Sequence, residues 1–204
     1  TVNPTSGLIT TEAGGAATFS VVLTSRPTEN VSVNLLSGDT TEGTVPAAIT
    51  FTPANWNSAQ NVTVTGVDDA VVDGSIGYTI VTTVSSLDSV YNGIAAADVS
   101  VTNMDNDTAG VVVNPTSGLV TTEAGSAATF SVILTSQPAA DVTVNLLSSD
   151  LSEGTAPAAI TFTPANWNAA QTVTVTGVDD ALADGNIGYT IQTTVTSGDA
   201  IYNG

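Results

Sequence analysis

Apolar and polar residues alternate over short segments of this chain. In residues 17–21, Ala, Phe and Val alternate with Thr and Ser, and similar patterns occupy residues 31–35, 49–51, 62–65, 76–80 and 99–101. With an opening strand near Val2, the alternation predicts seven strands in the first 107 residues. Turn-forming Gly, Pro, Asn and Asp separate these segments. We therefore expect an all-β fold, an antiparallel immunoglobulin-like β-sandwich, with a closed barrel as the alternative.

The whole pattern occurs twice along the chain. Residues 1–93 align with residues 112–204 at a constant offset of 111, and 70 of the 93 aligned pairs are identical. We expect two tandem sandwiches, residues 1–107 and 111–204, joined by a short linker at 108–110. The second copy lacks a counterpart of residues 94–107 and with it the last strand. The chain is then either a window from a longer array or receives that strand from a neighbouring subunit.

Composition and charge exclude several classes of function. The chain carries 19 acidic side chains and one cation, Arg26, for a formal net charge of −18, and it has no His or Cys. Without imidazole, thiol or amine side chains it lacks the usual general bases, nucleophiles and zinc ligands, so we expect no enzymatic activity. Nucleic-acid binding would need clustered cations, and no apolar run approaches the roughly 20 residues of a membrane span. Without disulfides, a metal ion is the remaining candidate for stabilising a secreted form.

The acidic residues of the first repeat fall in a particular set of loops. If consecutive strands alternate in direction, the loops after the first, third, fifth and seventh strands lie at one end of the sandwich. Eight acids belong to these loops, namely Glu12, Asp39, Glu42, Asp68, Asp69, Asp73, Asp105 and Asp107. The corresponding acids of the second repeat are Glu123, Asp150, Glu153, Asp179, Asp180 and Asp184. The opposite end keeps Glu29, Asp88 and Asp98 together with Arg26.

Such a concentration of negative charge requires a counterion. Two carboxylates about 4 Å apart repel by roughly 4 kcal/mol at an effective dielectric near 20, and Arg26 lies at the wrong end to relieve this. Calcium suits convergent loops because it accepts about 6–8 oxygen ligands in irregular geometry, whereas softer metals prefer ligands that this chain lacks. The pattern therefore predicts calcium sites at the acidic end. The alternative interpretation is a set of acid-rich turns that only keep the surface solvated.

Three segments resemble a known family. Thr11-Glu12-Ala13-Gly14 precedes a strand, Val64-Thr65-Gly66-Val67-Asp68-Asp69 is followed by Asp73, and the first repeat closes with Val101-Thr102-Asn103-Met104-Asp105-Asn106-Asp107. In order and spacing these segments resemble the Calx-beta domain, an immunoglobulin-like sandwich found in sodium/calcium exchangers and very large bacterial surface proteins. The resemblance implies that the acidic residues named above match the region where calcium-binding members of that family hold their ions.

The aromatic residues have structural interpretations. Tyr78 alternates with Ile76 and Ile80 and should belong to the core, while Asp88 and the Tyr91-Asn92-Gly93 segment are typical of a turn. Trp56 and Trp167 could stack on a sugar, but packing at the sandwich edge is the more common role for a single Trp per repeat.

These features together predict a structural spacer. We expect tandem sandwiches stiffened by calcium in a long extracellular fibre, adhesin or surface layer on a bacterial cell. The expected partners are neighbouring copies of the repeat, in the same chain or by strand donation between subunits, and a glycan or surface protein. A glycan- or protein-binding adhesion module and a regulatory calcium-sensing domain are the alternative functions.

Overall fold

The computed structural model describes residues 1–203, and these form strands, turns and loops without a helix. Accordingly, the described residues contain no helix that could cross a membrane. The chain divides into two compact units, Thr1–Asp69 with Asp73–Asn106 and Ala70–Val72 with Asp107–Gly204. We keep the names first repeat for residues 1–107 and second repeat for residues 111–204, and describe each by itself.

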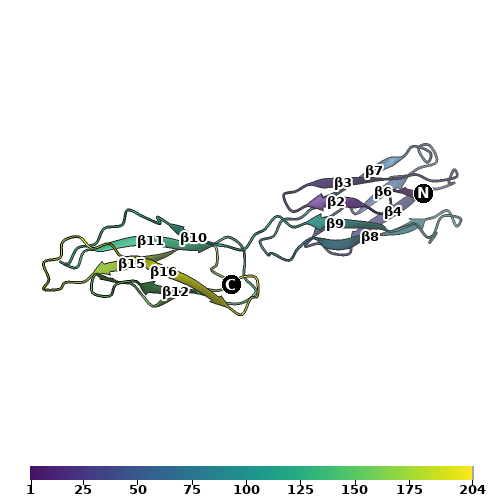
Figure 1. Ribbon diagram of the computed structural model, residues 1–204. Helices are drawn as coiled ribbons and strands as arrows, with labels where there is room; N and C mark the ends of the chain where they lie inside the picture. The colour runs from purple at the N-terminus through teal and green to yellow at the C-terminus, as the bar shows by residue number, and fades with distance from the viewer. Residues whose placement is uncertain (204) are drawn as a thin grey trace. The chain divides into compact units, whose positions relative to one another are not determined.

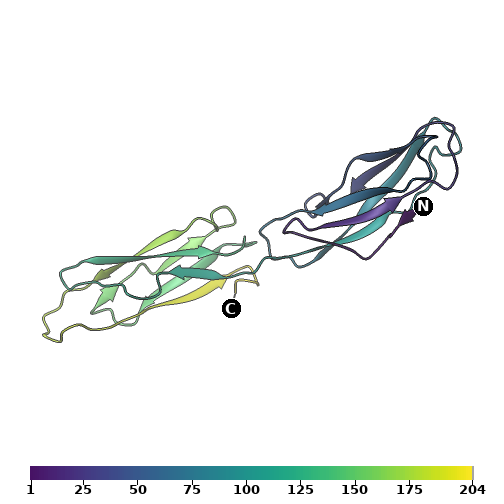
Figure 2. The same ribbon diagram turned by 90° about the horizontal axis from the view of Figure 1, so that it is seen from above.

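The first repeat is a sandwich of two sheets (Figure 1 and Figure 2). One sheet has the strand order β1-β3-β7-β5 and the other β2-β9-β8-β4-β6. Neighbouring strands are antiparallel except β2 and β9, which run parallel. The strands are β1 (Val2–Asn3), β2 (Leu8–Thr11), β3 (Ala16–Val21), β4 (Val31–Ser37), β5 (Gly43–Thr44), β6 (Ala48–Phe51), β7 (Gln60–Gly66), β8 (Ile76–Ser86) and β9 (Val99–Met104).

The alternation of the sequence decides which side chains form the core between the sheets. In β4, Val31, Val33 and Leu35 are buried, and the intervening residues are partly exposed. Phe19 and Phe51 contribute the largest buried side chains from the other strands. Removing such apolar area from water, at about 25 cal/mol per Å², is the main favourable contribution to folding of the repeat.

The first repeat has nine strand segments where the alternation predicts seven. The predicted opening strand is divided, because the chain leaves β3 after Asn3 and joins β9 at Leu8. The predicted fourth strand, residues 49–51, lies within β6, which pairs with β4, and it is preceded by a short segment that the alternation did not predict, β5, which pairs with β7. β1 runs antiparallel to β3, and the end of β2 runs antiparallel to the residue just before β3. The chain therefore passes from one sheet to the other without reversing its direction. Apolar alternation does not encode which sheet a short strand joins, and the division was therefore missed.

The second repeat has the same plan with fewer strands. Its sheets have the orders β10-β11-β15-β13 and β14-β12-β16. The strands are β10 (Val111–Asn114), β11 (Ala127–Leu134), β12 (Val142–Ser148), β13 (Gly154–Thr155), β14 (Ala159–Phe162), β15 (Gln171–Gly177) and β16 (Ile191–Ser197). Among the described residues, the smaller sheet contains no counterpart of β2 or β9. Both repeats are immunoglobulin-like β-sandwiches, and the second lacks its last strand.

The predicted roles of the tyrosines and of the Asp88 turn are confirmed. Tyr78 is buried in the first core, and the Tyr91 hydroxyl donates to the Ser25 carbonyl oxygen at 2.7 Å. The Asp88 carboxylate accepts a hydrogen bond of 2.8 Å from the Thr28 backbone N–H, which fixes the turn. Tyr202 makes the equivalent contact in the second repeat, where its hydroxyl donates to the Ser136 carbonyl oxygen.

Candidate metal centres

Two adjacent strand ends position the first group of carboxylates. Strands β2 and β9 are parallel neighbours whose last residues, Thr11 and Met104, pair with each other. The next residues along the two strands are Glu12 and Asp105, so the sheet register itself brings their side chains to the same place. The Glu12 backbone N–H continues the pairing with a 3.1 Å hydrogen bond to the Met104 carbonyl oxygen.

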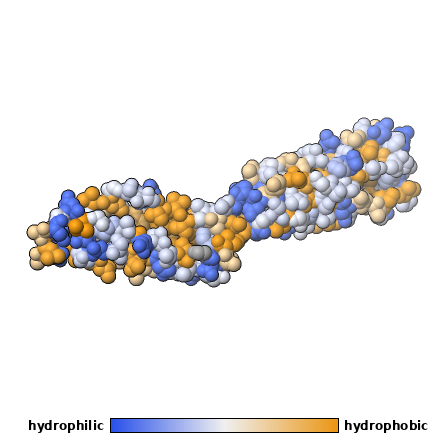
Figure 3. Space-filling view, viewed as in Figure 1, coloured by the Kyte–Doolittle hydropathy of each residue, from blue (hydrophilic) through white to orange (hydrophobic). Residues whose placement is uncertain are grey.

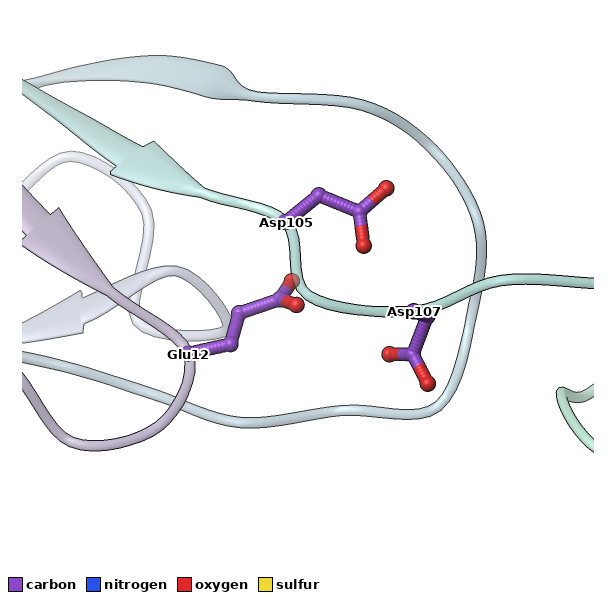
Figure 4. Close-up of side chains that lie close together, drawn as sticks. All are labelled: Glu12, Asp105 and Asp107. Carbon is purple, nitrogen blue, oxygen red and sulfur yellow. The ribbon is translucent and has the colours of Figure 1, made fainter.

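Asp107 completes a triad with these two residues. One carboxylate oxygen from each of Glu12, Asp105 and Asp107 lies within 4.8 Å of the others, and Figure 4 shows the three side chains around the chain segment that leaves β9. Glu12 is only 3% exposed, and its Oε2 accepts a 2.9 Å hydrogen bond from the Asn106 backbone N–H. The buried Glu12 carboxylate therefore lies close to two further carboxylates.

Glu42, Asp69 and Asp73 form a second triad in the first repeat, with the same 4.8 Å limit between their oxygens. Glu42 immediately precedes β5, and Val67, the residue after β7, donates its backbone N–H to the Glu42 carbonyl oxygen at 3.0 Å. The pairing of β5 with β7 thus places Glu42 beside the loop that carries the two aspartates. Glu42 is 5% exposed.

Burial and neighbouring charges disfavour ionisation of Glu42 and Asp73 in the second triad. Burial raises the pKa of Glu42, and the charges of Asp73, Asp39 and Asp69 raise it further, against a hydrogen bond from Asn103 that lowers it. Desolvation also raises the pKa of Asp73, with Asp69 and Asp105 adding to the effect. Because Asp105 belongs to the first triad, the two triads are coupled electrostatically.

The second repeat contains one such triad among its described residues. It consists of Glu153, Asp180 and Asp184, the counterparts of Glu42, Asp69 and Asp73. Glu153 is only partly buried. Desolvation and the neighbouring Asp184 raise its pKa, as do Asp150, Asp180 and Glu123. The triad is therefore repeated, in a more open setting.

Five of the predicted ligands lie outside the triads. Asp39 accepts hydrogen bonds from the Thr41 hydroxyl at 2.6 Å and the Thr41 N–H at 3.0 Å, which lower its pKa. Asp150 makes the equivalent contacts with Ser152. Asp68 accepts a 3.2 Å bond from Asn106 Nδ2. Glu123 and Asp179 are exposed. Asp39 and Asp150 thus stabilise local turns, and the strongest candidates for metal ligands are the members of the three triads.

Asn103 is a residue of this region that the sequence analysis missed. It is 1% exposed, accepts a 2.9 Å hydrogen bond from the Thr10 hydroxyl, and donates through Nδ2 to Glu42 Oε2 at 3.3 Å and to the Val67 carbonyl oxygen at 3.0 Å. The signal was available, because Asn103 continues the inward positions of Val99 and Val101. A polar residue in phase with core positions indicates a buried hydrogen-bond network.

The raised pKa values predict a pH dependence for the metal-free chain. A carboxyl with a higher pKa in the folded than in the unfolded chain binds more protons when folded, so stability falls as pH rises. For Glu42 this loss begins above its ordinary value of 4.5. The lowered pKa of Asp39 acts in the opposite direction, but only below its ordinary value of 3.8. In metal-depleted buffer we expect a higher unfolding midpoint near pH 5 than near pH 7.

Thermal melts at the two pH values check this expectation. The Glu42→Gln variant removes one of the groups whose pKa is raised and should reduce the difference between them. A metal-free chain that melts at a higher temperature near pH 7 than near pH 5 would contradict the prediction.

No protein-family model matches this chain, and no curated protein matches it. Similar solved structures include the calcium binding domain CBD12 of CALX1.1, with 17% identity, a TM-score of 0.38 and coverage of 88% of this chain and 76% of that one. CBD12 from CALX1.2 has 14% identity and a TM-score of 0.38, covering 95% of this chain and 78% of that one. SSP-19, an MSP-domain protein like family member in Caenorhabditis elegans, has 14% identity and a TM-score of 0.39, covering 52% of this chain and 99% of its own. These similarities assign neither a function nor a site to the chain.

Proposed function

We propose that this chain is a calcium-binding structural repeat of a long extracellular protein. The observation that carries the proposal is the pair of buried glutamates, Glu12 and Glu42, each held within 4.8 Å of two aspartate side chains from distant parts of the sequence. An exposed acidic turn would let its carboxylates separate into water. A buried glutamate carboxylate with two aspartate carboxylates nearby instead favours protonation or a bound cation.

The chemistry of the donors fits a hard divalent cation. Each triad offers only carboxylate oxygens, and the chain contains no His or Cys that a softer metal would prefer. Calcium accepts oxygen ligands in irregular geometry, and water or nearby backbone carbonyls can complete its coordination. When bound, the ion would neutralise the negative charge of these carboxylates.

The first triad gives the ion a mechanical role. Asp105 and Asp107 belong to the segment that leaves β9, and Glu12 belongs to the end of β2 (Figure 4). A cation shared by the three side chains would hold this departing segment against the sandwich. Residues 108–110 follow at once, so calcium would restrict the chain that joins one repeat to the next.

The tandem duplication supports a structural role for the repeat. Copies that are identical at 70 of 93 aligned positions suit a protein that extends by repetition. Together with the Calx-beta-like motifs and the absence of cysteine, this favours a non-enzymatic part of a bacterial fibre, adhesin or surface layer. Its partners would then be further copies of the repeat and, at the end of the array, a glycan or surface protein.

A calorimetric titration of the metal-depleted chain with calcium tests the proposal. We expect saturable binding with a dissociation constant of about 10⁻⁴–10⁻³ M, the range of extracellular modules. Glu12→Gln keeps an acceptor for the Asn106 N–H but removes a charged ligand, and should weaken one site about tenfold. Glu29→Gln is the matched control, since it removes the same charge at an exposed position outside the triads. Equal weakening by both variants, or no binding, would refute the proposal.

A further inference from the structure

The outer faces of the two sheets of the first repeat differ in hydrophobicity. The sheet β2-β9-β8-β4-β6 turns four large apolar side chains away from the core, each 37–65% exposed, namely Ile9, Leu36, Val81 and Met104. The described strands of the other sheet have no exposed large apolar residue, and their outer positions are mainly Thr, Ser and Asn. Figure 3 shows residues of intermediate hydropathy over much of the visible face of this repeat, with hydrophobic residues among them.

The register of the sheet arranges these side chains in two pairs. Leu36 on β4 pairs directly with Val81 on β8, so the two side chains are neighbours on the outer face. Ile9 and Met104 lie on the adjacent strands β2 and β9, and Met104 pairs with Thr11, two residues beyond Ile9. The apolar residues therefore form small groups on one surface rather than single exposed side chains scattered over the repeat.

A small hollow opens beside Leu36. It has a volume of about 200 Å³, and the residues that line it include Leu36, Val45 and Ala47. Leu36 itself is 65% exposed, the most of the four apolar residues on this face. A projecting side chain beside a hollow suits a symmetric contact between two copies, because each copy then supplies both parts.

The distribution of charge favours a second copy of the chain as the partner. Within residues 1–203 no strand contains a charged side chain, although the net charge is −18. Asp98, which immediately precedes β9, accepts a 2.8 Å hydrogen bond from the Thr82 backbone N–H. Two copies that met through their loops would bring carboxylates together, whereas the strands of this face carry no charge that repels a copy. A basic partner would be attracted to the acidic loops instead.

From these observations we infer that the outer face of β2-β9-β8-β4-β6 is a lateral self-association surface, through which the first repeats of two chains pair about Leu36 and Val81. The second repeat keeps the leucine as Leu147, 60% exposed, but has Gln192 in the place of Val81. The contact is thus expected mainly in the first repeat. It needs no calcium, and it adds a side-by-side contact to the end-to-end repetition of the proposed function.

The size of the face predicts a weak dimer. Strands about 4.8 Å apart and about six residues long, at about 3.3 Å per residue, give this five-stranded sheet a face of about 500 Å². Two copies would then bury about 1,000 Å² in total, the range of transient contacts, so we expect dimers at about 0.1–1 mM protein. If the proposed function is correct, many such contacts along two fibres would act together and hold the fibres side by side.

Sedimentation equilibrium of the full chain tests the inference. The measurement is made in chelator, so its result is independent of the calcium titration. Raising sodium chloride from about 10 mM to about 1 M shortens the Debye length from about 30 Å to about 3 Å, which screens the repulsion between the chains. Because the proposed contact is uncharged, we expect the dimer fraction to rise with salt. A contact made through charged groups would weaken instead.

Matched variants locate the contact. Leu36→Glu places a charge on the face at a side chain that is already 65% exposed, and should weaken dimerisation at least about tenfold. Thr63→Glu adds the same charge at an exposed outer position of the other sheet and should leave dimerisation unchanged. Leu36→Ser removes apolar area without adding charge, and should weaken the dimer by a smaller factor. Fluorescence of Trp56 in the Trp167→Phe background shows whether each variant remains folded.

Three results would overturn the inference. The first is a chain that stays monomeric at high salt and at the highest protein concentration, and the second is equal dimerisation of the Leu36→Glu and Thr63→Glu variants. The third is a monomeric chain that sediments with neutral phosphatidylcholine vesicles and loses this property in Leu36→Glu, because the face would then bind a lipid surface.

Discussion

Withdrawal of calcium is expected to lower the unfolding midpoint of the first repeat by about 10–20 °C. A ligand present at 100 times its dissociation constant stabilises the folded state by about 2.7 kcal/mol. For a domain of roughly 100 residues, each 1 kcal/mol shifts the midpoint by about 4–8 °C. With a dissociation constant near 10⁻⁴ M, about 10 mM calcium is enough to give this effect at one site, and the second triad would add to it.

The two tryptophans allow the repeats to be followed separately. The chain contains one Trp in each repeat, so Trp167→Phe leaves a reporter in the first repeat and Trp56→Phe leaves one in the second. We expect a smaller calcium effect in the second repeat, because its one described triad is built around a partly exposed Glu153.

Ionic strength and ion size provide the controls for this experiment. Sodium chloride at matched ionic strength screens the carboxylates without coordinating them, and magnesium demands a stricter octahedral geometry than the triads suggest. Both should give less than half of the calcium shift. If chelator and calcium gave the same midpoint in the first repeat, the triads would not be calcium sites under these conditions.

The location of the acidic end could be predicted because strand direction alone determines it. The divided opening strand changes sheets without reversing, so Glu12 and Asp105 still follow strands that end at the same side of the sandwich. Adding or missing a strand that reversed direction would have moved one of them to the opposite end. The prediction thus depended on the parity of the strands and tolerated an error in their number.

The division of the acids into triads could not be predicted from the same pattern. It depends on the register of β2 with β9 and on the short pairing of β5 with β7, neither of which alternation encodes. Asp39 illustrates the difficulty, because it belongs to the same loop between β4 and β5 as Glu42. Its carboxylate instead bonds to Thr41 two residues away, a local contact that competes with metal binding.

Replacing Asn103 by Ala should lower the free energy of unfolding of the first repeat by about 3 kcal/mol. Each buried polar group left without a partner costs about 1–3 kcal/mol, and more if it is charged. Asn103 serves three groups, the Thr10 hydroxyl, the Glu42 carboxylate and the Val67 carbonyl. Its removal also leaves a cavity beside Glu42. Chemical denaturation of the Trp167→Phe background measures the loss.

Two further variants distinguish the hydrogen bonds from the volume of the side chain. Asn106→Ala changes an exposed neighbour whose side chain bonds only to Asp68 among the described contacts, and should cost less than about 1 kcal/mol. Asn103→Asp keeps the shape but turns an acceptor towards Glu42, and so should destabilise the repeat more near pH 7 than near pH 5. If Asn103→Asp were as stable as the parent chain at both pH values, the amide would not be the donor that holds Glu42 in place. The second triad would then depend on backbone pairing of β5 with β7 alone.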